Sequence, residues 1–297
     1  MNILLKLKVH LPMLIVILKI IRDLPFLIKS VMLNKRRFRF SAVKHLNEKI
    51  LNGFVVLGSG PTVNELTESQ INCISNKVSM AVGRWIYHDF VPDIYLMETG
   101  KSEQILKWLK DFCKILHEKK EDYKNTIILI DNIQGDAFLQ DLIEDIFPNS
   151  LKQNLYYTQT IKPPHETIET FSSFLKFMKL TKINYMLGLM AHCRSSAVSS
   201  SMLGHYIGAK EISLVGVDGF TGYFMDESHK DFHADYGGVD KNYNQVLHST
   251  SNPEYGVPTV TDCFILISKY YTPCFVSSKN ALLSKYLELT TLEDEFV

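Results

Sequence analysis

Residues 55–66 read VVLGSGPTVNEL: an apolar run ends in Gly58-Ser59-Gly60, and Pro61 and Thr62 then introduce a helical pattern. Glycines permit a tight turn and a close approach of backbone to a ligand, and proline fixes φ at a helix start. Amide groups at such a start favour an anion such as phosphate. We therefore predict that this turn contacts a nucleotide; the alternative is a plain strand-to-helix turn.

Two familiar phosphate-binding motifs are excluded at this turn. The dinucleotide fingerprint G-x-G-x-x-G needs a third glycine where Val63 stands. A Walker A loop needs G-K-[ST], and none follows. The turn therefore does not identify the nucleotide.

Short apolar runs alternate with helical patterns from about residue 50 onward. Runs such as TIILID and EISLVGVD are apolar throughout, as expected of strands buried on both faces. We predict an α/β fold, Rossmann-like, with a mostly parallel sheet and helices on both faces. The predicted strands are 54–58, 78–82, 93–97, 126–131, 211–217 and 273–277. The predicted helices are 64–74, 102–118, 137–147, 167–180, 190–207 and 261–271, with another after Lys279.

The N-terminal region combines large apolar residues with basic ones, and it carries nine Lys or Arg against one acid, Asp23, up to residue 40. Its longest uncharged stretch, 9–18, is far short of the ~20 apolar residues that span a bilayer. This pattern, followed by the basic run 34–39, favours a helix lying in the interface of an anionic membrane. The alternatives are an arm packed on the domain or on another subunit, and a true span.

We accordingly divide the chain into a membrane-associating arm, 1–45, and one Rossmann-like catalytic domain, 46–297. Residues 220–258 are rich in Gly, Asp, His, Tyr and Asn, and such a long segment is typical of a lid or binding loop. Lys plus Arg equals Asp plus Glu, so no nucleic-acid partner is indicated. The five cysteines are scattered without a CxxC spacing, which favours a reducing, cytosolic compartment.

A second candidate region, residues 192–219, reads HCRSSAVSSSMLGHYIGAKEISLVGVDG. A helix of small residues ends at Gly208 and leads into a buried strand that ends at Asp218. Arg194 offers five donors suited to phosphate or carboxylate. Ser195 and Ser196 add hydroxyl groups near the helix start.

These stretches resemble the bacterial sialyltransferases of glycosyltransferase family 42 and a wider group of nucleotide-sugar enzymes. The family's first strand ends in G-N-G-P-S. A later block reads roughly R-x-T-S-G, a small-residue helix, G-x-K-E-I-Y-L-x-G-I-D and a loop with a Tyr, like 194–224 here. A weaker match is YYTPCFVSSKNALLSKYLEL, residues 270–289. Together the matches cover most of residues 54–290.

The resemblance implies a nucleotide site and a tyrosine that hydrogen-bonds the departing phosphate, here Tyr223. It implies nucleotide contacts at Gly58, Ser59, Gly60, Pro61, Thr62, Ser195, Ser196 and Asp218, and Arg194 also matches a family arginine. Ser59 replaces the family's Asn, which places the identity of the nucleotide in question. After the second strand, Arg84 and Trp85 stand near the family's Asn, where Arg84 would bind phosphate or a sugar carboxylate and Trp85 would stack on a ring. The alternative for both is a pair on the surface at a strand end.

The family's catalytic histidine is absent, because Val257 occupies the aligned position. Three loop histidines are candidates for the general base: His229, His233 and His248. We favour His233, between Asp231 and Asp235. His229 and His233 would also share a helix face and hold a metal, or the segment is simply a solvated polar loop; we predict no metal.

The resemblance thus implies a membrane-associated glycosyltransferase. It would transfer an acidic sugar from a CMP-activated donor, with no cofactor, to a glycan or lipid-linked acceptor of a surface polysaccharide or lipooligosaccharide. Its expected location is peripheral, on the cytoplasmic face of the inner membrane, and a homo-oligomer is compatible with the sequence. Two rivals stay open: an ATP- and Mg²⁺-dependent pyrophosphokinase on the same fold, and a non-catalytic membrane-bound scaffold that binds no nucleotide.

Overall fold

The chain divides into two compact units, each assembled from two separate stretches of sequence. The computed structural model describes residues 12–131, 136–163, 167–183, 187–191, 194–220, 223–224, 247–255, 257–290 and 292. Unit 1 contains the described residues of 1–44 and 95–193, and unit 2 those of 45–94 and 194–297. This division differs from the predicted boundary at residues 45–46, because the N-terminal helix groups with residues 95–193.

Unit 2 is built on four adjacent strands in the order β2-β1-β8-β9. Their bounds are β1 Phe54–Leu57, β2 Val78–Val82, β8 Ile212–Val215 and β9 Cys274–Val276. β1 is central and pairs in parallel with β2 and β8, while β8 pairs in parallel with β9. Every residue of β1, β2 and β8 is buried. These strands are mostly apolar because they have no solvent-facing side.

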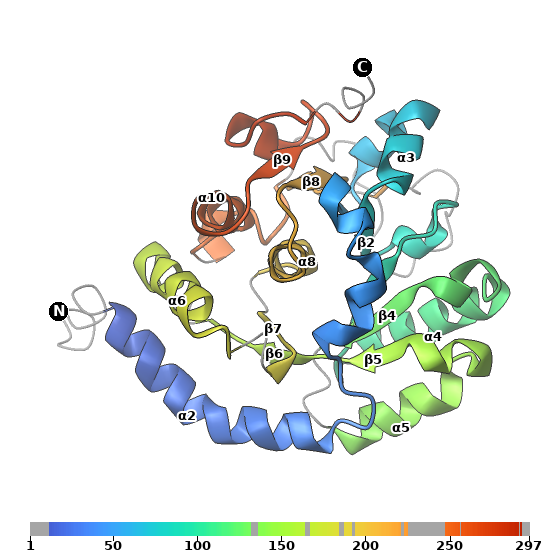
Figure 1. Cartoon of the computed structure of the whole chain (residues 1–297), viewed down its shortest axis with the longest axis horizontal. Coiled ribbons are helices and arrows are strands. Elements are labelled where there is room, and N and C mark those ends of the chain that lie inside the picture. Colours follow the sequence, from blue (N-terminus) through green and yellow to red (C-terminus); the bar gives the residue numbers. More distant parts are fainter. Residues whose placement is uncertain are drawn as a thin grey trace. The chain divides into compact units, whose positions relative to one another are not determined.

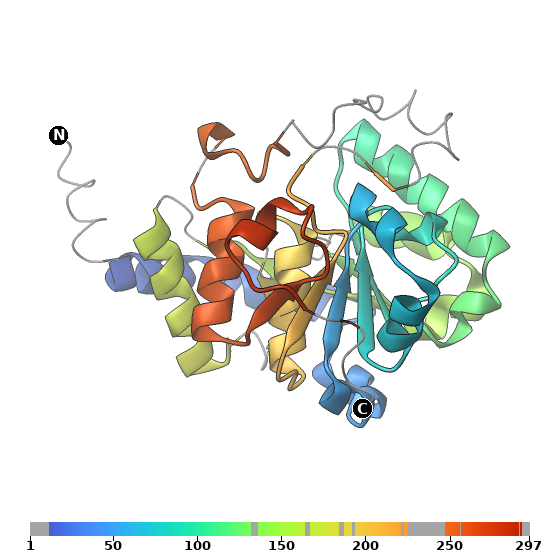
Figure 2. The ribbon, with the colours of Figure 1, turned by 90° about the horizontal axis from the view of Figure 1, so that it is seen from above.

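The helices of unit 2 include one unusual for its small side chains. The α-helices are α3 Glu68–Ser75, α8 Ser196–Tyr206 and α10 Val260–Tyr270, and the 3₁₀ turns are η2 Lys49–Asn52, η3 Pro61–Glu65, η4 Trp85–Tyr87, η8 Pro253–Tyr255 and η9 Leu282–Lys285. α8 packs against β1, β2 and α10, and Figures 1 and 2 show it beside α10. The hydroxyls of Ser200 and Ser201 donate to carbonyls one turn back, 2.8 and 3.0 Å away. The helix can therefore be buried without leaving these groups unpaired.

Unit 1 contains the strand order β5-β4-β3 and a separate parallel pair, β6 and β7. The strands are β3 Ile94–Glu98, β4 Ile127–Asp131, β5 Leu155–Tyr157, β6 Gln159–Ile161 and β7 Leu189–Ala191. The helices are α2 Pro12–Leu33, α4 Glu103–Glu118, α5 Ala137–Ile146 and α6 Ile168–Thr181, with 3₁₀ turns η1 Phe40–Leu46, η5 Asp122–Asn125 and η6 Asn149–Asn154. α2 packs on α6 and β6, and Figure 1 shows the two helices as neighbours.

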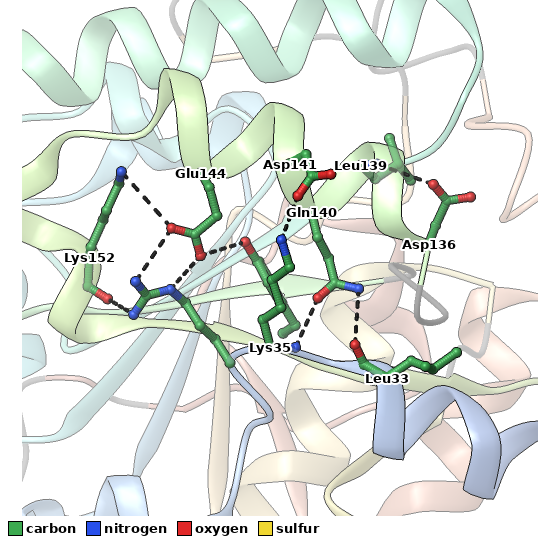
Figure 3. A network of polar contacts seen from close by, with 10 residues as sticks. Leu33, Lys35, Asp136, Leu139, Gln140, Asp141, Glu144 and Lys152 are labelled. Carbon is green, nitrogen blue, oxygen red and sulfur yellow. Dashed lines mark hydrogen bonds and ion pairs between the residues drawn. The ribbon is translucent and has the colours of Figure 1, made fainter.

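The segment after α2 is fixed by polar contacts to α5 (Figure 3). Lys35 pairs with Asp141. Arg36 pairs with Glu144 and donates to the Lys152 carbonyl at 2.8 Å. These two basic side chains, which we expected at anionic headgroups, are thus engaged within unit 1.

The predicted α/β class and mostly parallel pairing are confirmed, and each of the six predicted strands is present. The helix predicted over 190–207 is wrong at its start, because Met190 lies in β7 and α8 begins at Ser196. The helix predicted over 64–74 is divided into η3 and α3. The last predicted helix is the short turn η9. None of the helices in the described ranges is long and apolar enough to cross a membrane.

Candidate functional site

A cavity of about 200 Å³ opens in unit 2 beyond the carboxyl ends of β1, β2 and β8. This is where open α/β sheets bind ligands. Five parts of unit 2 contribute to its lining: the turn after β1, the turn after β2, the start of α8, the segment after β8, and residues 248–251. Of the predicted site residues, the lining includes Gly58, Ser59, Gly60, Ser195, Ser196, Asp218, Tyr223 and His248.

The turn after β1 faces the cavity, but its amides are largely paired inside the protein. The amides of Gly58 and Gly60 donate to the carbonyls of Val215 and Gly216, at 2.7 and 2.8 Å. The Thr62 amide donates to Asp218 Oδ2 at 2.9 Å. The helix that follows, η3, is a single five-residue 3₁₀ turn. The turn therefore does not offer the row of amide donors that we expected at this helix start. Pro61 and Thr62 are buried and are not among the residues that line the cavity.

Gly60 is required by a close approach of two backbone segments. A Cβ at this position would lie 2.8 Å from the Gly216 carbonyl oxygen and closer still to the Asp218 carboxylate. Gly216 itself has a φ of 63°, in the left-handed region that favours glycine. The turns after β1 and β8 therefore interlock at the cavity edge.

Asp218 connects these two turns with a buried carboxylate that is 5% exposed. It accepts from the Thr62 amide and, at 2.5 Å, from the Thr62 hydroxyl. Burial raises the pKa of Asp218, and the two hydrogen bonds from Thr62 act in the opposite direction. With both donors supplied by Thr62, Asp218 shapes the cavity wall more than it offers charge to a ligand.

Ser59, which stands where the resembled family has Asn, also holds the turn together. Its Oγ donates to the Val82 carbonyl at 3.1 Å and accepts from the Arg84 amide at 2.7 Å. The backbone of Arg84 is thus fixed at the cavity edge, while Val82 and Gly83 supply the lining there.

Trp85 has a structural role in place of the predicted stacking on a ligand. It is fully buried, its indole N–H donates to the Phe90 carbonyl at 2.9 Å, and its ring stacks on His88 at 4.5 Å. The Phe224 ring packs against both, at 5.8 Å from Trp85 and 5.5 Å from His88. This cluster supports the segment that carries Tyr223.

Tyr223 is held over the cavity by its neighbour Phe224. The Phe224 amide donates to the Ser59 carbonyl at 3.1 Å, and its carbonyl accepts from the Asn64 side chain at 3.0 Å. These bonds hold Tyr223 where it lines the cavity beside the turn after β1.

The start of α8 points into the cavity with three lining residues, Ser195, Ser196 and Ala197. Ser195 is the N-cap, and its side chain accepts from the Val198 amide. The first amides of an α-helix have no partner within the helix and carry partial positive charge. The α8 start thus presents the amides of Ser196 and Ala197, with the Ser196 hydroxyl, to a ligand anion.

Arg194 lies immediately before α8 but is directed to another partner. Its Nε donates to the Pro258 carbonyl at 2.8 Å, and it is not among the lining residues. Its φ of 63° is in the left-handed region. In this geometry Arg194 fastens the α8 start to the segment before α10.

His248 lines the cavity together with Thr250 and Ser251. The Thr250 amide donates to its Nδ1 at 3.3 Å, and the Thr250 hydroxyl lies 2.8 Å from the same atom. Because an amide only donates, Nδ1 is the acceptor and the neutral ring carries its proton on Nε2. Although His248 is exposed to solvent, partial desolvation lowers its pKa. This tautomer suits a hydrogen-bond donor to a ligand more than a general base.

Ser251 is a lining residue that sequence reasoning missed. It is 6% exposed, and within the described structure its Oγ has no hydrogen-bond partner. A buried unpaired hydroxyl at a cavity wall is suited to a polar group of a ligand. No local pattern marks this residue in the sequence, since Thr250 and Ser251 resemble any polar loop pair.

His229 and His233 lie outside the described residues, as does most of the predicted lid. Across the described ranges, no three or more His, Cys, Asp or Glu side chains are grouped to hold a metal ion.

No protein-family model and no curated protein matches the chain. Among solved structures, it is similar to the sialyltransferase CST-II, crystallised with a trisaccharide acceptor and CMP, at 15% identity. The match covers 82% of this chain and 89% of CST-II, with a TM-score of 0.47. It is also similar to the monofunctional α-2,3-sialyltransferase Cst-I from Campylobacter jejuni, at 14% identity, 83% coverage of each chain and a TM-score of 0.47. Both are sialyltransferases, the kind of enzyme that the sequence blocks resemble.

Proposed function

We propose that this protein is a glycosyltransferase that transfers an acidic sugar from a CMP-activated donor to a hydroxyl group of a glycan. The observation that carries the proposal is the distribution of amide donors around the unit 2 cavity. The amides of Gly58, Gly60 and Thr62 are paired internally, whereas the α8 start faces the cavity.

A single helix start suits a single phosphoryl group. Di- and triphosphates in α/β folds are usually cradled by the glycine-rich turn after the first strand. Here the Gly58, Gly60 and Thr62 amides of that turn are occupied, so the cavity matches a nucleoside monophosphate better than a diphosphate. CMP-sugars are donors of this type, with one phosphate linking nucleoside and sugar.

The remaining cavity groups fit the departure of that phosphate. In the reaction, the bond between the anomeric carbon and the phosphate oxygen breaks, and negative charge develops on the phosphate. Donors aimed at this charge lower the barrier. We assign this role to the amides at the α8 start, the Tyr223 phenol and the Nε2–H of His248, while the Ser251 hydroxyl holds another polar group of the donor.

The acceptor oxygen forms the new bond to the anomeric carbon and loses its proton to a general base. Because the tautomer of His248 suits a donor, we assign the base to His233, with His229 as the alternative. Replacing His233 by Ala should then reduce transfer by ~10²–10⁴-fold with CMP affinity little changed. The acceptor that we propose is a lipid-linked surface glycan, which places the enzyme peripherally at the cytoplasmic face of the inner membrane.

A ligand panel tests the proposal, because a ligand that binds only the native state raises apparent stability. We expect CMP to raise the melting temperature more than CDP, UDP or ATP, without added metal. A larger shift by ATP with Mg²⁺ would indicate the pyrophosphokinase instead. A chain that responds to no nucleotide would be the non-catalytic scaffold.

A further inference from the structure

α2 has two apolar faces, and only one of them is used inside unit 1. The inner face is formed by the buried residues Val16, Ile20, Leu27 and Val31. This face is the one available to α6 and β6, the elements on which α2 packs. An ordinary helix at a protein surface would carry polar side chains on the opposite face.

A second face of α2, exposed and beside the inner one, is apolar over its whole length. Its residues follow one another at intervals of four and three: Leu14, Leu18, Ile21, Pro25, Ile28 and Met32. We call this set the outer stripe. All six residues are exposed, with Ile21 at 61% and Met32 at 79%. At 3.6 residues per turn they form one line, about 27 Å long.

A basic flank accompanies the outer stripe. Arg22 and Lys29 are both exposed and seven residues apart, so they lie on the same side of the stripe. Arg22 forms an exposed ion pair with Asp23, which also pairs with Lys19. The net charge of the flank is therefore positive.

The orientation of the outer stripe is fixed by the segment that follows α2 (Figure 3). Gln140 of α5 accepts from the Lys35 amide at 2.9 Å and donates to the Leu33 carbonyl at 3.4 Å. With Lys35 paired to Asp141 and Arg36 to Glu144, the C-terminal end of α2 cannot rotate freely. The inner face stays on unit 1 and the outer stripe stays outward.

A long apolar line beside cationic side chains is the pattern of a helix lying in the plane of a membrane surface. A second copy of the chain fits less well, because an antiparallel pairing through the stripe would bring the two basic flanks to one side. We propose that α2 docks on an anionic lipid surface, with the outer stripe at the boundary of headgroups and acyl chains. Arg22 and Lys29 then lie against the lipid phosphates. This inference is independent of the reaction that unit 2 catalyses.

The test measures co-sedimentation of the full chain with vesicles of phosphatidylcholine that contain about 30% phosphatidylglycerol, which makes the vesicle surface anionic. We expect Ile21→Glu/Met32→Glu to lower the vesicle affinity at least tenfold. The matched control is Leu180→Glu, which changes an equally exposed leucine of α6 (81%) and should leave the affinity unchanged. Arg22→Glu/Lys29→Glu, on the exposed flank, should lower it as well and should leave folding intact, and vesicles of phosphatidylcholine alone should bind the parent weakly.

Three results would overturn the proposal. The parent chain does not sediment with anionic vesicles, the stripe and flank variants bind as the parent does, or the stripe variant turns an oligomer into a monomer without changing vesicle binding. The last result would assign the outer stripe to a second copy. Nucleotide binding by the variants, measured in parallel, should equal that of the parent, which separates this proposal from the proposed function.

Discussion

The carboxylate of Asp218 receives both of its hydrogen bonds from one residue, Thr62, which lies 156 positions earlier in the chain. The backbone amide and the hydroxyl of Thr62 donate to different carboxylate oxygens. The turns after β1 and β8 are joined through this contact at the edge of the cavity. The geometry of the candidate site therefore depends on a pair that is not itself aimed at a ligand.

Thr62→Val should destabilise the protein by about 1–3 kcal/mol, because it leaves a buried carboxylate without one donor. The loss should be larger at pH 8 than at pH 4. Burial raises the pKa of Asp218, so the folded state binds a proton more tightly than the unfolded state, whose pKa is about 3.9. The contribution of Asp218 to stability therefore falls as pH rises from about 4 to about 8. Losing the Thr62 hydroxyl raises the folded pKa of Asp218 further, so the variant loses more stability at pH 8. Urea unfolding at both pH values measures this, with Thr62→Ser as the control that keeps the hydroxyl.

Ser196→Glu should separate ligand binding from stability. An acidic side chain in the first turn of α8 interacts favourably with the helix dipole, by about 0.3–1 kcal/mol. The same charge at the cavity should repel a phosphate and weaken CMP binding at least tenfold, a change of about 1.4 kcal/mol. Ser196→Gln, of similar size and neutral, should bind CMP within a few-fold of the parent. Equal CMP affinity in the Glu and Gln variants, by calorimetry, would remove the α8 start from the site.

His248 should act as a donor, and two substitutions distinguish this role from that of a base. His248→Gln keeps an N–H donor and should retain transfer activity to within about tenfold. His248→Leu removes the donor and should lose ~10²–10³-fold in kcat, as the loss of one donor to developing charge does. If His248 were the general base, both variants would lose transfer activity to the same extent. Turnover of a CMP-sugar donor provides the measurement.

At Arg194, a glycine substitution should destabilise the protein less than an alanine substitution. Arg194→Ala loses the bond to the Pro258 carbonyl but keeps the left-handed φ of 63°, which is unfavourable for a residue with a Cβ. Arg194→Gly loses the same bond and relieves that strain. The Gly variant should therefore be more stable than the Ala variant by about 1 kcal/mol. Thermal unfolding that ranks Ala above Gly would contradict this account of the α8 start.

Glu144 should contribute stability that disappears in acid. Its hydrogen bond to Arg36 is the main cause that lowers the pKa of Glu144. A lowered folded pKa means that the contribution is present above the unfolded pKa of about 4.3 and is lost as pH falls through the folded value. We expect parent and Glu144→Gln to differ by about 1 kcal/mol at pH 7 and to converge below about pH 4. Glu118→Gln, at the exposed end of α4, is the control and should leave stability unchanged at both pH values.

The parts of the fold predicted from sequence are those with a strong hydrophobic pattern. β1, β4 and β8 were recognisable because both faces are buried and most of their residues are apolar. β6, which contains buried Gln159 and Thr160, was missed, because a strand of three residues with two polar side chains carries no strand pattern. The predicted helix 190–207 includes Met190 and Ala191 of β7, since a short apolar run does not distinguish a buried strand from a helix.

In the candidate site, the sequence located the glycine turn and the start of α8, because glycine and serine there reflect local backbone needs. The direction of long side chains was a different matter. Arg194 bonds a carbonyl that lies 64 residues away, and Trp85 packs on Phe224. Such partners are fixed only by tertiary structure, and charge or aromatic type alone does not reveal them.

The central position of β1 also bears on how the protein is made. β1 leaves the ribosome early, but β8, its partner on one edge, follows about 158 residues later, since Phe54 is paired with Ile212. At 5–20 residues per second, synthesis of that interval takes about 8–30 s. During this time an apolar strand with an open edge awaits its neighbour, the kind of surface that chaperones cover and that aggregates form from. Yield in cells should therefore respond to translation speed and chaperone supply more than the stability of the finished protein would suggest.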